Sequence, residues 1–302
     1  MKSAIIFTGT SGSVGAGILD FFGKQNKQLY SVGRKQPKNN SGEYNFIVAD
    51  LRDETSSKSV LSSISNKCSK FTIIHLAAYK PNSANISNSI DCYNFNKTID
   101  DNVRKIAEEI NAKVIYMSTC GLYDQSDSLW KFAGKSKIQA FEPYFRSKIE
   151  GEEKFFSSGK GVIFRLSSPL SNLMDARLVV PKMIRSLVQR GYIEVWGSGR
   201  REQDFIDVRD IHTLLKKAEA KPSLNGIFNL ASGKPISMKN LAENLIELYG
   251  KGYVKNVNQD PNEGSFARYS IVQTKEKFNW HPETSHIDSF KRQLNLHRGF
   301  SC

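Results

Sequence analysis

Apolar residues follow two different patterns along the first half of the chain. Short apolar runs alternate with longer stretches in which apolar residues recur every three or four positions. The runs predict buried strands and the longer stretches predict helices, an order that is typical of a parallel sheet covered by helices. The predicted strands are residues 4–8, 29–32, 46–49, 72–76, 114–118 and 162–166, and the predicted helices are residues 14–23, 56–66, 90–110 and 145–156. The first half therefore predicts an α/β fold with a doubly wound parallel sheet.

The pattern of apolar residues changes in the second half of the chain. This half contains a helical stretch, short strands around a glycine-rich turn, and an amphipathic helix closed by glycine, at residues 178–191, 192–208 and 237–250. Residues 226–231 have the pattern of one more buried strand, which we expect to return to the first sheet. The sequence thus predicts a sheet domain, residues 1–168, followed by a smaller mixed α/β lobe, residues 169–302.

The composition is that of a globular protein. The chain has 302 residues, of which 39% are hydrophobic, enough to fill a core. No apolar run approaches the roughly 20 residues of a membrane helix, and the sequence reaches a glycine too early for a signal peptide. The four cysteines are scattered, and no histidine stands at metal-ligand spacing, so we expect neither disulfides nor a metal site. These features predict a soluble cytoplasmic protein without a membrane partner.

The chain carries a net charge of +13, from 43 basic and 30 acidic residues. Such a charge fits a nucleic-acid partner, a polyphosphate small molecule or a merely solvated basic surface. The lysines and arginines are spread along the whole chain, without the basic arm or the interleaved aromatic residues of RNA-binding modules. We therefore expect no nucleic-acid partner.

The most specific motif is "FTGTSGSVGAG", residues 7–17, which lies between a predicted strand and a predicted helix. Its TGxxGxxG pattern is typical of a Rossmann dinucleotide-binding turn, because glycines let the backbone approach a pyrophosphate at the amino end of a helix. A flexible surface loop is the alternative interpretation. The residues that we assign to the cofactor in this turn are Gly9, Ser11, Gly12, Ser13, Val14 and Gly15. Gly17 falls within the helix, where we expect it to serve close packing.

The end of the second predicted strand indicates which dinucleotide is bound. It reads "YSVGRKQ", without the carboxylate that usually holds the 2′-hydroxyl of NAD. Arg34 and Lys35 instead favour the 2′-phosphate of NADP. The alternative is that two exposed basic residues simply begin a loop, so NAD stays possible.

Three polar side chains have the types and positions of a proton-transfer site. Tyr144 and Lys148 are four residues apart on a predicted helix, so they share one face. A nearby ammonium lowers the pKa of a phenol, and we expect Lys148 to do so for Tyr144. Thr119 ends a predicted strand, where open α/β sheets place their ligands, and its hydroxyl can bond a reacting oxygen. Each motif alone also fits an exposed helix face or a capped strand.

Together these motifs resemble the extended short-chain dehydrogenase/reductase family of nucleotide-sugar epimerases, dehydratases and 4-keto reductases. The resemblance covers almost the whole chain. It includes the glycine-rich turn, the tyrosine–lysine pair and the segments "ADLRD", "IIHLAA", "STCGLY", "VWGSGRREQDFIDVRDI", "FNLASGKPISMKNLA" and "FNWHPETS". It implies a nucleotide-sugar-binding second lobe and a homodimer formed through the helices at residues 90–110 and 145–156.

The resemblance also implies roles for individual residues. Tyr144 is expected to be the acid/base, Lys148 to bind the nicotinamide ribose, and Thr119 to polarise the reacting oxygen. Beyond the turn, the expected cofactor-binding residues are Arg34, Lys35, Asp50, Leu51, Leu76, Ala77, Ala78, Asn94, Tyr144 and Lys148. Asp50 is expected at the adenine.

The expected substrate-binding residues are Lys80, Ser168, Arg200, Arg201 and Arg268. Ser168 replaces an asparagine that is frequent in the family, and Gln203 replaces a frequent arginine, so we expect the diphosphate contact at Arg200 or Arg201. Arg268 is a further candidate. Each of these arginines also fits a solvated surface position.

The residues after Thr119 bear on the reaction. A dehydratase of this family typically has Asp and Glu there, whereas this chain has Cys120 and Gly121, which disfavours dehydration. Because Arg34 favours NADP, we expect an NADP-dependent reductase of a nucleotide-activated 4-keto-(deoxy)sugar, serving surface-polysaccharide synthesis. An NAD(P)-dependent nucleotide-sugar 4-epimerase is the alternative. A non-catalytic dinucleotide-sensing protein on the same fold is a hypothesis of another class.

Overall fold

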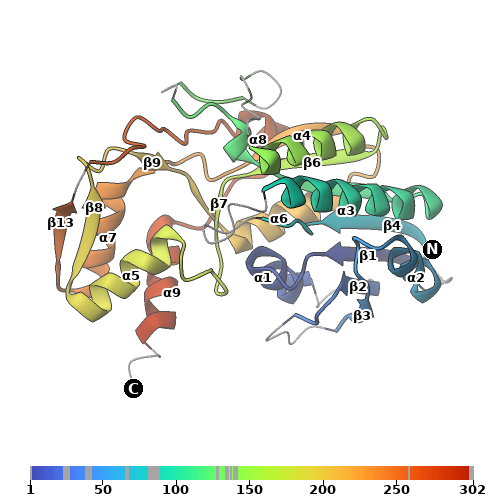
Figure 1. Cartoon of the computed structure of the whole chain (residues 1–302), viewed down its shortest axis with the longest axis horizontal. Helices are drawn as coiled ribbons and strands as arrows, with labels where there is room; N and C mark the ends of the chain where they lie inside the picture. Colours follow the sequence, from blue (N-terminus) through green and yellow to red (C-terminus); the bar gives the residue numbers. More distant parts are fainter. Residues whose placement is uncertain are drawn as a thin grey trace.

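A seven-stranded parallel sheet forms the centre of the first part of the molecule (Figure 1). The computed structural model describes residues 2–22, 28–37, 43–64, 68–80, 89–126, 129–132, 136, 138, 142–257 and 259–298. The strands lie in the order β3 (Asn45–Val48), β2 (Gln28–Gly33), β1 (Lys2–Thr8), β4 (Cys68–His75), β5 (Lys113–Thr119), β6 (Gly161–Leu166) and β11 (Gly226–Leu230). All neighbours run parallel. The predicted doubly wound sheet is confirmed.

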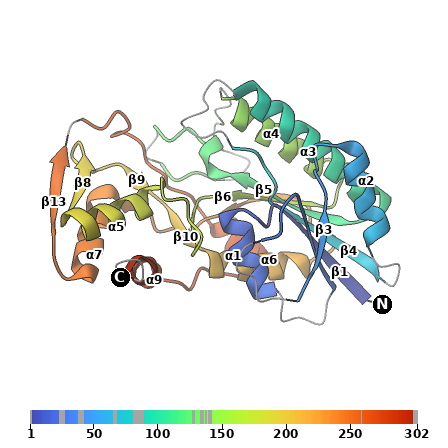
Figure 2. The ribbon, with the colours of Figure 1, turned by 60° about the horizontal axis from the view of Figure 1, so that its bottom comes forward.

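Helices cover both faces of this sheet (Figure 2). One face carries α2 (Glu54–Ser63), α3 (Ser89–Glu109) and α4 (Pro143–Phe156), and the other carries α1 (Ser13–Phe22), α6 (Val208–Glu219) and α8 (Val272–Phe278). Along β1, Ile5 and Phe7 join one core while Ala4 and Ile6 join the other, and all four are buried. Burial on both faces explains why the strands are almost uninterrupted apolar runs in the sequence. The last residues of two predicted helices, Gly23 and Ser65 to Asn66, lie outside the described residues.

The order in which successive strands are added to the sheet reverses beside β1. The chain proceeds from β1 to β2 and β3 on one side, and then returns to the other side with β4. Helices that follow β1 and β4 lie on opposite faces, which leaves a crevice at the carboxyl ends of these strands. Ligands of doubly wound sheets bind where the strand order reverses, so a ligand site is expected at this edge of the sheet.

The second lobe is a mixed α/β unit with a core of its own. Helices α5 (Val179–Arg190), α7 (Met238–Tyr249) and α9 (His286–Arg298) pack with β8 (Tyr192–Trp196) and β13 (Tyr253–Val257). Two further strand pairs are β7 (Ser168–Leu170) with β10 (Phe205–Asp207), and β9 (Glu202–Gln203) with β12 (Ile236–Ser237). Helix α7 ends at Gly250, whose φ of 87° is left-handed, as the sequence predicts.

The second half of the chain also contributes to the main sheet. Strand β11 pairs with β6 at the sheet edge, and α6 and α8 pack beneath the sheet. Strand β7 begins at Ser168, two residues after β6 ends at Leu166. The second lobe therefore starts at the same carboxyl edge of the sheet where the crevice lies. Within the described residues, no helix combines the length and apolar character needed to span a bilayer.

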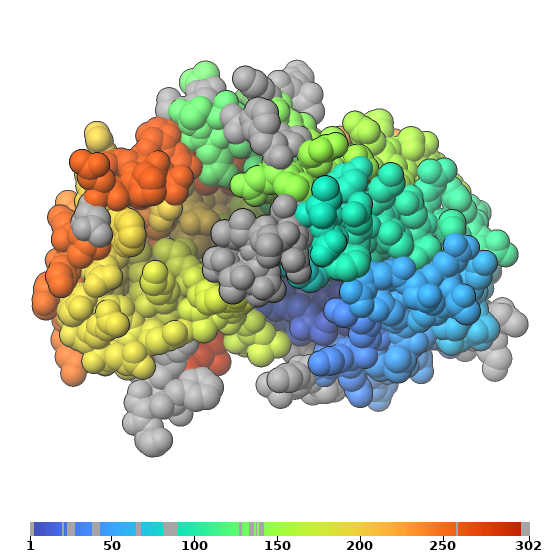
Figure 3. Space-filling model, in the orientation of Figure 1, coloured from blue at the N-terminus to red at the C-terminus, as the bar shows by residue number. Residues whose placement is uncertain are grey.

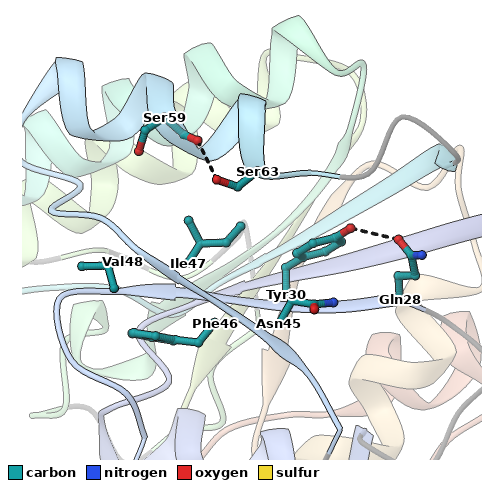
Figure 4. Close-up of a pocket in the computed structure, with 8 residues that line it drawn as sticks. All are labelled: Gln28, Tyr30, Asn45, Phe46, Ile47, Val48, Ser59 and Ser63. Carbon is teal, nitrogen blue, oxygen red and sulfur yellow. Dashed lines mark hydrogen bonds between the residues drawn. The ribbon is translucent and has the colours of Figure 1, made fainter.

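A hollow of about 450 Å³ lies at the outer edge of the sheet, between β2, β3 and the end of α2 (Figure 4). Its lining consists of Gln28, Tyr30, Asn45, Phe46, Ile47, Val48, Ser59 and Ser63. The Tyr30 hydroxyl donates to Gln28, at 2.9 Å, so its polar group is already satisfied. The lining has no acidic or basic side chain, and it therefore offers no charge to balance a phosphate.

Lys113 makes a buried contact between the first residue of β5 and the end of α6. Its ammonium donates to the carbonyl oxygens of Ala218 at 2.6 Å and Lys221 at 2.5 Å. Burial lowers the pKa of Lys113 from 10.5 to about 8. At a pH between these two pKa values, Lys113 is protonated in the unfolded chain and neutral in the folded chain. The contribution of Lys113 to the free energy of unfolding therefore rises with pH in this range.

We expect this dependence to disappear in the Lys113→Met variant. From pH 7 to pH 10, the free energy of unfolding of the wild type should rise relative to the variant by on the order of 2 kcal/mol. Chemical denaturation of both proteins over this pH range measures the difference. A difference that stays constant with pH would contradict the assignment.

Candidate active site

The glycine-rich turn lies directly against the end of β4. Gly9 follows β1 with a φ of 75°, and a Cβ built on it would lie 2.5 Å from the backbone nitrogen of Ala77. A Cβ on Gly15 would overlap the carbonyl oxygen of Gly9, while the Gly12 amide donates to that same oxygen at 3.1 Å. The turn is therefore so tightly folded that Gly9 and Gly15 have no space for a side chain. Helix α1 begins at Ser13, and the amides of its first turn lack partners within the helix.

The other predicted residues of this region lie around the turn. Ser11 is exposed, and Ser13 and Val14 are half-buried in the first turn of α1. On the β4 side, the Leu76 amide donates to the Thr8 carbonyl at 3.3 Å, and Ala78 is exposed. The structure thus brings the two predicted backbone segments together at one edge of the sheet. Gly17, deeper in α1, lies against Val208 of α6, which fits the expected role in packing.

Arg34 and Asp50 lie near one another at the ends of β2 and β3. Arg34 and Lys35 are exposed after β2. The Asp50 carboxylate accepts three hydrogen bonds from the Arg52 guanidinium, at 3.0 and 3.2 Å from Nε and 2.7 Å from Nη2. These hydrogen bonds lower the pKa of Asp50, and the charge of Arg34 lowers it further. Leu51 is buried, and its carbonyl accepts from Asn102 of α3 at 2.9 Å.

Arg52 is a candidate that the sequence analysis missed, although it stands inside the quoted segment "ADLRD". Its guanidinium lies over the Phe95 ring of α3, 5.0 Å from the ring centre. The signal for it was present in the sequence, because an arginine two residues after an aspartate at a strand end can fold back onto the carboxylate. Because the charge of Arg52 is paired with Asp50, the excess positive charge at the end of the sheet near β2 and β3 comes from Arg34 and Lys35.

Thr119 is the last residue of β5, and its hydroxyl oxygen accepts from the Gly121 amide at 3.1 Å. This bond uses a lone pair of the oxygen and leaves the hydroxyl proton to donate. Tyr144, the second residue of α4, is half-buried, and the Lys80 ammonium lies over its ring at 5.8 Å from the centre. Lys80 thus lies beside Tyr144.

The pKa of Tyr144 differs from the sequence-based expectation. Burial, followed by the charges of Cys92 and Asp100, raises it to about 12. Lys148 does not lower it in this arrangement, because its buried ammonium donates to the Met117 carbonyl at 3.0 Å and to the Tyr116 hydroxyl at 3.3 Å. The expectation that Lys148 lowers the pKa of Tyr144 is therefore wrong for these side-chain positions: the lysine reaches beneath the tyrosine, toward the sheet.

Asn94 and Asn96 occupy different faces of α3. Asn94, the predicted cofactor residue, is exposed. Asn96 is buried, accepts from the Tyr79 amide at 2.6 Å, and donates to the Tyr79 carbonyl at 2.9 Å and to Ser147 of α4 at 3.1 Å. Asn96 thus joins the segment after β4 to the helix that carries Tyr144. The helical spacing of the buried residues Cys92, Asn96, Ile99 and Val103 was the signal that distinguishes the two asparagines.

A basic pocket of about 510 Å³ lies in the second lobe. It is bordered by α5, by the end of β8 and by residues 260–262, and Figure 3 shows the orange segment around residue 260 beside the yellow surface of α5 and β8. Its lining includes Arg177, Lys182, Arg185, Arg190 and Arg201 together with the acidic residues Glu194 and Asp260. The half-exposed Trp196 contributes an aromatic face. This excess of positive charge beside an aromatic ring suits an aromatic base joined to phosphates.

The predicted substrate residues differ in their relation to this pocket. Arg201 lines it and lies 3.4 Å from the Asp260 carboxylate. Arg200 is exposed and donates to the Ser198 hydroxyl at 3.1 Å. Arg268 forms a two-pronged ion pair with Glu202, at 2.5 and 2.6 Å, which neutralises its charge. Ser168 accepts from the Gln203 amide at 2.5 Å. Of the predicted substrate residues, Arg201 is the one that lines the pocket.

The segment that follows Thr119 is tied to the second lobe. The Phe266 amide donates to the Gln125 carbonyl at 2.8 Å, and the Lys131 amide donates to the Arg268 carbonyl at 3.1 Å. The Gln125 side chain also donates to the Tyr269 hydroxyl at 3.0 Å. These bonds hold part of the second lobe close to the end of β5.

Comparison with known proteins agrees with this geometry. Residues 5–231 match the model of the NAD dependent epimerase/dehydratase family. The chain belongs to this family. It is 24% identical to the UDP-glucose 4-epimerase of Halalkalibacterium halodurans over 80% of this chain and 78% of that protein. It is 23% identical to the UDP-glucuronate 4-epimerase of Thermodesulfobacterium geofontis over 96% of this chain and 94% of that protein.

A solved structure shares the fold of the enzyme. The UDP-N-acetylglucosamine 4-epimerase from Methanobrevibacter ruminantium M1, in complex with UDP-N-acetylmuramic acid, superposes with a TM-score of 0.85. The match covers 99% of this chain and 100% of that chain at 19% identity. The resemblance to an extended short-chain dehydrogenase/reductase is thereby confirmed at the level of family and fold.

The glycine-rich turn of the enzyme fits the dinucleotide of this family. A side chain at Gly9 would overlap the Ala77 backbone, and one at Gly15 would overlap the Gly9 carbonyl, so either would force the turn apart. Without those side chains, the first-turn amides of α1 face the crevice where an anionic pyrophosphate is stabilised. When bound there, NAD supplies the oxidation and reduction of the substrate, and the protein supplies binding and proton transfer.

A methyl group at Gly15 should weaken dinucleotide binding. The Gly15→Ala variant keeps a good helix former in α1, but its Cβ displaces the Gly9 carbonyl and widens the turn. We expect the NADH dissociation constant, measured by fluorescence titration, to rise about 10-fold or more. Gly264→Ala, at a site with no atom within 4 Å of the added Cβ, should bind like the wild type. Equal affinity of the two variants would contradict the position of the phosphates.

Proposed function

We propose that the enzyme is an NAD(P)-dependent nucleotide-sugar 4-epimerase. The observation that carries this proposal is the packing of α4, which bears Tyr144 and Lys148, against β5, which ends at Thr119, in the same sheet whose carboxyl edge bears the glycine-rich turn. The two curated relatives that match most of the chain are both 4-epimerases, which favours this reaction over the keto reduction expected from the sequence.

The basic pocket of the second lobe is the proposed site for the nucleoside diphosphate. Lys182 supplies positive charge for the two phosphates together with Arg201, whose charge is shared with the Asp260 carboxylate, and Trp196 supplies a face for the base. The relatives named above are named for UDP-sugars, which supports a uridine nucleotide here. The sugar would then extend toward the end of β5, where the bonds from Gln125 hold the two parts together.

The side chains at the sheet edge divide the proton chemistry between them. The hydroxyl of Thr119 donates to the oxygen at C4 of the sugar, and Tyr144 exchanges a proton with the same oxygen. Oxidation of the sugar requires the phenolate of Tyr144, which takes the hydroxyl proton, and reduction returns that proton from the phenol. Burial raises the pKa of Tyr144 and favours the phenol, so the phenolate would have to be stabilised by the positive charge of the oxidised nicotinamide when the dinucleotide is bound. A full epimerisation therefore leaves no net change in protons or electrons, and consumes no reductant.

The residues after Thr119 support this choice against dehydration. Cys120 is fully buried, and its thiol donates to the Arg165 carbonyl at 3.0 Å, while Gly121 has no side chain. Neither position offers a carboxylate that removes water across the sugar ring. The homodimer implied by the resemblance stays a prediction; α3 and α4, which would form its interface, pack side by side on one face of the sheet.

Keto reduction with NADPH is the second candidate, and Arg34 favours it. Arg34 follows β2 where a 2′-phosphate is held, and its charge, like that of Arg52, acts on Asp50. A reductase uses NADPH stoichiometrically, whereas an epimerase returns its electrons to the sugar. The same residues serve both reactions, so the consumption of reductant separates them.

Product analysis tests the proposed function directly. We expect the purified enzyme, given NAD or NADP in a small fixed amount, to interconvert UDP-glucose or UDP-glucuronate with the C4 epimer, as followed by NMR. No progressive change in absorbance at the nicotinamide band should accompany the conversion. Stoichiometric oxidation of NADPH by a nucleotide 4-keto-sugar, with no interconversion of the sugars, would establish the reductase instead. Binding of the dinucleotide without either reaction would establish a sensing protein.

Removal of one hydroxyl tests the role of Tyr144. The Tyr144→Phe variant should lose about 10²- to 10⁴-fold in kcat, the usual contribution of a positioned acid/base, with little change in NADH affinity. Tyr253→Phe is the matched control, because Tyr253 is exposed on β13 in the other lobe and should keep full activity. Unchanged turnover of Tyr144→Phe would remove this residue from the proposed mechanism.

A further inference from the structure

A chain of buried hydrogen bonds runs beneath the candidate site from the glycine-rich turn to Lys148. The Thr8 hydroxyl lies 2.7 Å from Nδ1 of His75, and Nε2 of that ring lies 2.9 Å from the Asp100 carboxylate. The Tyr116 hydroxyl donates to the other oxygen of Asp100 at 3.0 Å, and the Lys148 ammonium donates to the Tyr116 oxygen at 3.3 Å. All five side chains are buried, and they come from β1, β4, α3, β5 and α4.

The direction of each hydrogen bond follows from the charge of Asp100. An ionised carboxylate accepts only, so Nε2 of His75 carries the proton and Nδ1 accepts from Thr8. Burial lowers the pKa of His75, which keeps this ring neutral. The Thr8 oxygen in turn accepts from the Ala77 amide at 3.2 Å. These five hydrogen-bonded side chains thus have one consistent arrangement of protons, and Asp100 is the negatively charged residue among them.

Lys148 is the positive member of this chain. Burial lowers its pKa, while the charges of Asp100 on α3 and Glu152 on α4 raise it; Cys92 of α3 acts in the same direction. Glu152 already accepts from Ser118 and Arg165, so its charge is shared with a nearer cation. Asp100, linked to Lys148 through one tyrosine hydroxyl, is therefore the counter-ion that belongs to the lysine.

Gly151 of α4 leaves the space that the hydrogen bond between Tyr116 and Asp100 occupies. A Cβ built on Gly151 would overlap the hydroxyl oxygen of Tyr116 and Oδ2 of Asp100. Gly151 stands three residues after Lys148, on the turn of α4 that faces β5. The contact between Tyr116 and Asp100 therefore depends on the missing side chain in the helix that carries the candidate catalytic pair.

We propose that Asp100, acting through Tyr116, is a positioning residue that keeps Lys148 protonated and fixes its ammonium beneath Tyr144, with one N–H left over for the ribose of the bound dinucleotide. Through His75 and Thr8, the same carboxylate also connects the lysine to the glycine-rich turn that holds the pyrophosphate. This inference rests on the proposed function, because it assigns Lys148 to the nicotinamide ribose.

The experiment is the pH dependence of NADH binding in the full-length enzyme. Asp100→Asn removes the charge with almost no change in shape, and Tyr116→Phe removes the linking hydroxyl but keeps the ring. The control is Asp101→Asn, which alters the neighbouring residue of α3, whose carboxylate pairs with Lys154 on a more exposed part of the helix. Fluorescence titrations between pH 6 and pH 10, with melting temperatures measured alongside, give the affinity and verify folding.

We expect Asp100→Asn and Tyr116→Phe to lose affinity at a pH about one unit lower than the wild type, because an ammonium without its counter-ion deprotonates earlier. At a pH above both transitions, the dissociation constant of these variants should be about 10-fold higher than that of the wild type, and well below both transitions it should be the same. The double variant should behave like either single variant, because either substitution alone already breaks the connection between Asp100 and Lys148. Asp101→Asn should follow the wild-type curve.

Different results overturn different statements. Wild-type pH curves in both single variants, whatever their melting temperatures, would show that Asp100 only stabilises the fold, and so would effects that simply add in the double variant. Failure of the wild type to bind either NADH or NADPH would overturn the proposed function itself. Normal NADH binding without sugar conversion would overturn the epimerase assignment and leave the role of Asp100 supported by the binding curves.

Discussion

The backbone of Gly9, just after β1, lies directly against the backbone of Ala77, just after β4, and the candidate site is arranged around this contact. A side chain at this point would separate β1 from the end of β4 and move the start of α1 away from the crevice. The phosphate site, the segment after β4 and the buried bond from Thr8 to His75 all lie within a few residues of this contact. Under the proposed function, this close approach of two backbone segments would set the position of the dinucleotide.

A buried ion pair gives the catalytic helix its position relative to that contact. Glu152 of α4 accepts two hydrogen bonds from Arg165 of β6, at 2.9 and 2.7 Å, and one from Ser118 of β5 at 2.5 Å. Breaking such a pair costs more than its formation gains, since one charge would stay buried alone. The helix is thus held to two strands at once, and Tyr144 and Thr119 keep their relative positions.

Much of this architecture could be predicted from the sequence because it depends on local patterns. Buried strands of a parallel sheet are apolar runs, and Gly9 and Gly15 mark positions where the backbone itself is in contact. The choice between Asn94 and Asn96 depends instead on which face of α3 meets the sheet, and periodicity had to be applied residue by residue to find it. The pKa of Tyr144 depends on where the Lys148 ammonium lies, and no spacing along the chain determines that.

The distribution of charge shows why the net value of +13 was ambiguous in the sequence. A diffuse excess of lysine and arginine has the same total whether it covers a surface or lines a cleft. In the structure, part of it lines the pocket of the second lobe and part surrounds Asp50 at the end of β3, where Arg34 and Arg52 lie. Both places suit phosphates attached to small molecules, and they lie in the two parts of the chain that would hold the two nucleotides. Of the three explanations compatible with the charge, a polyphosphate small molecule is the one that accounts for both clusters.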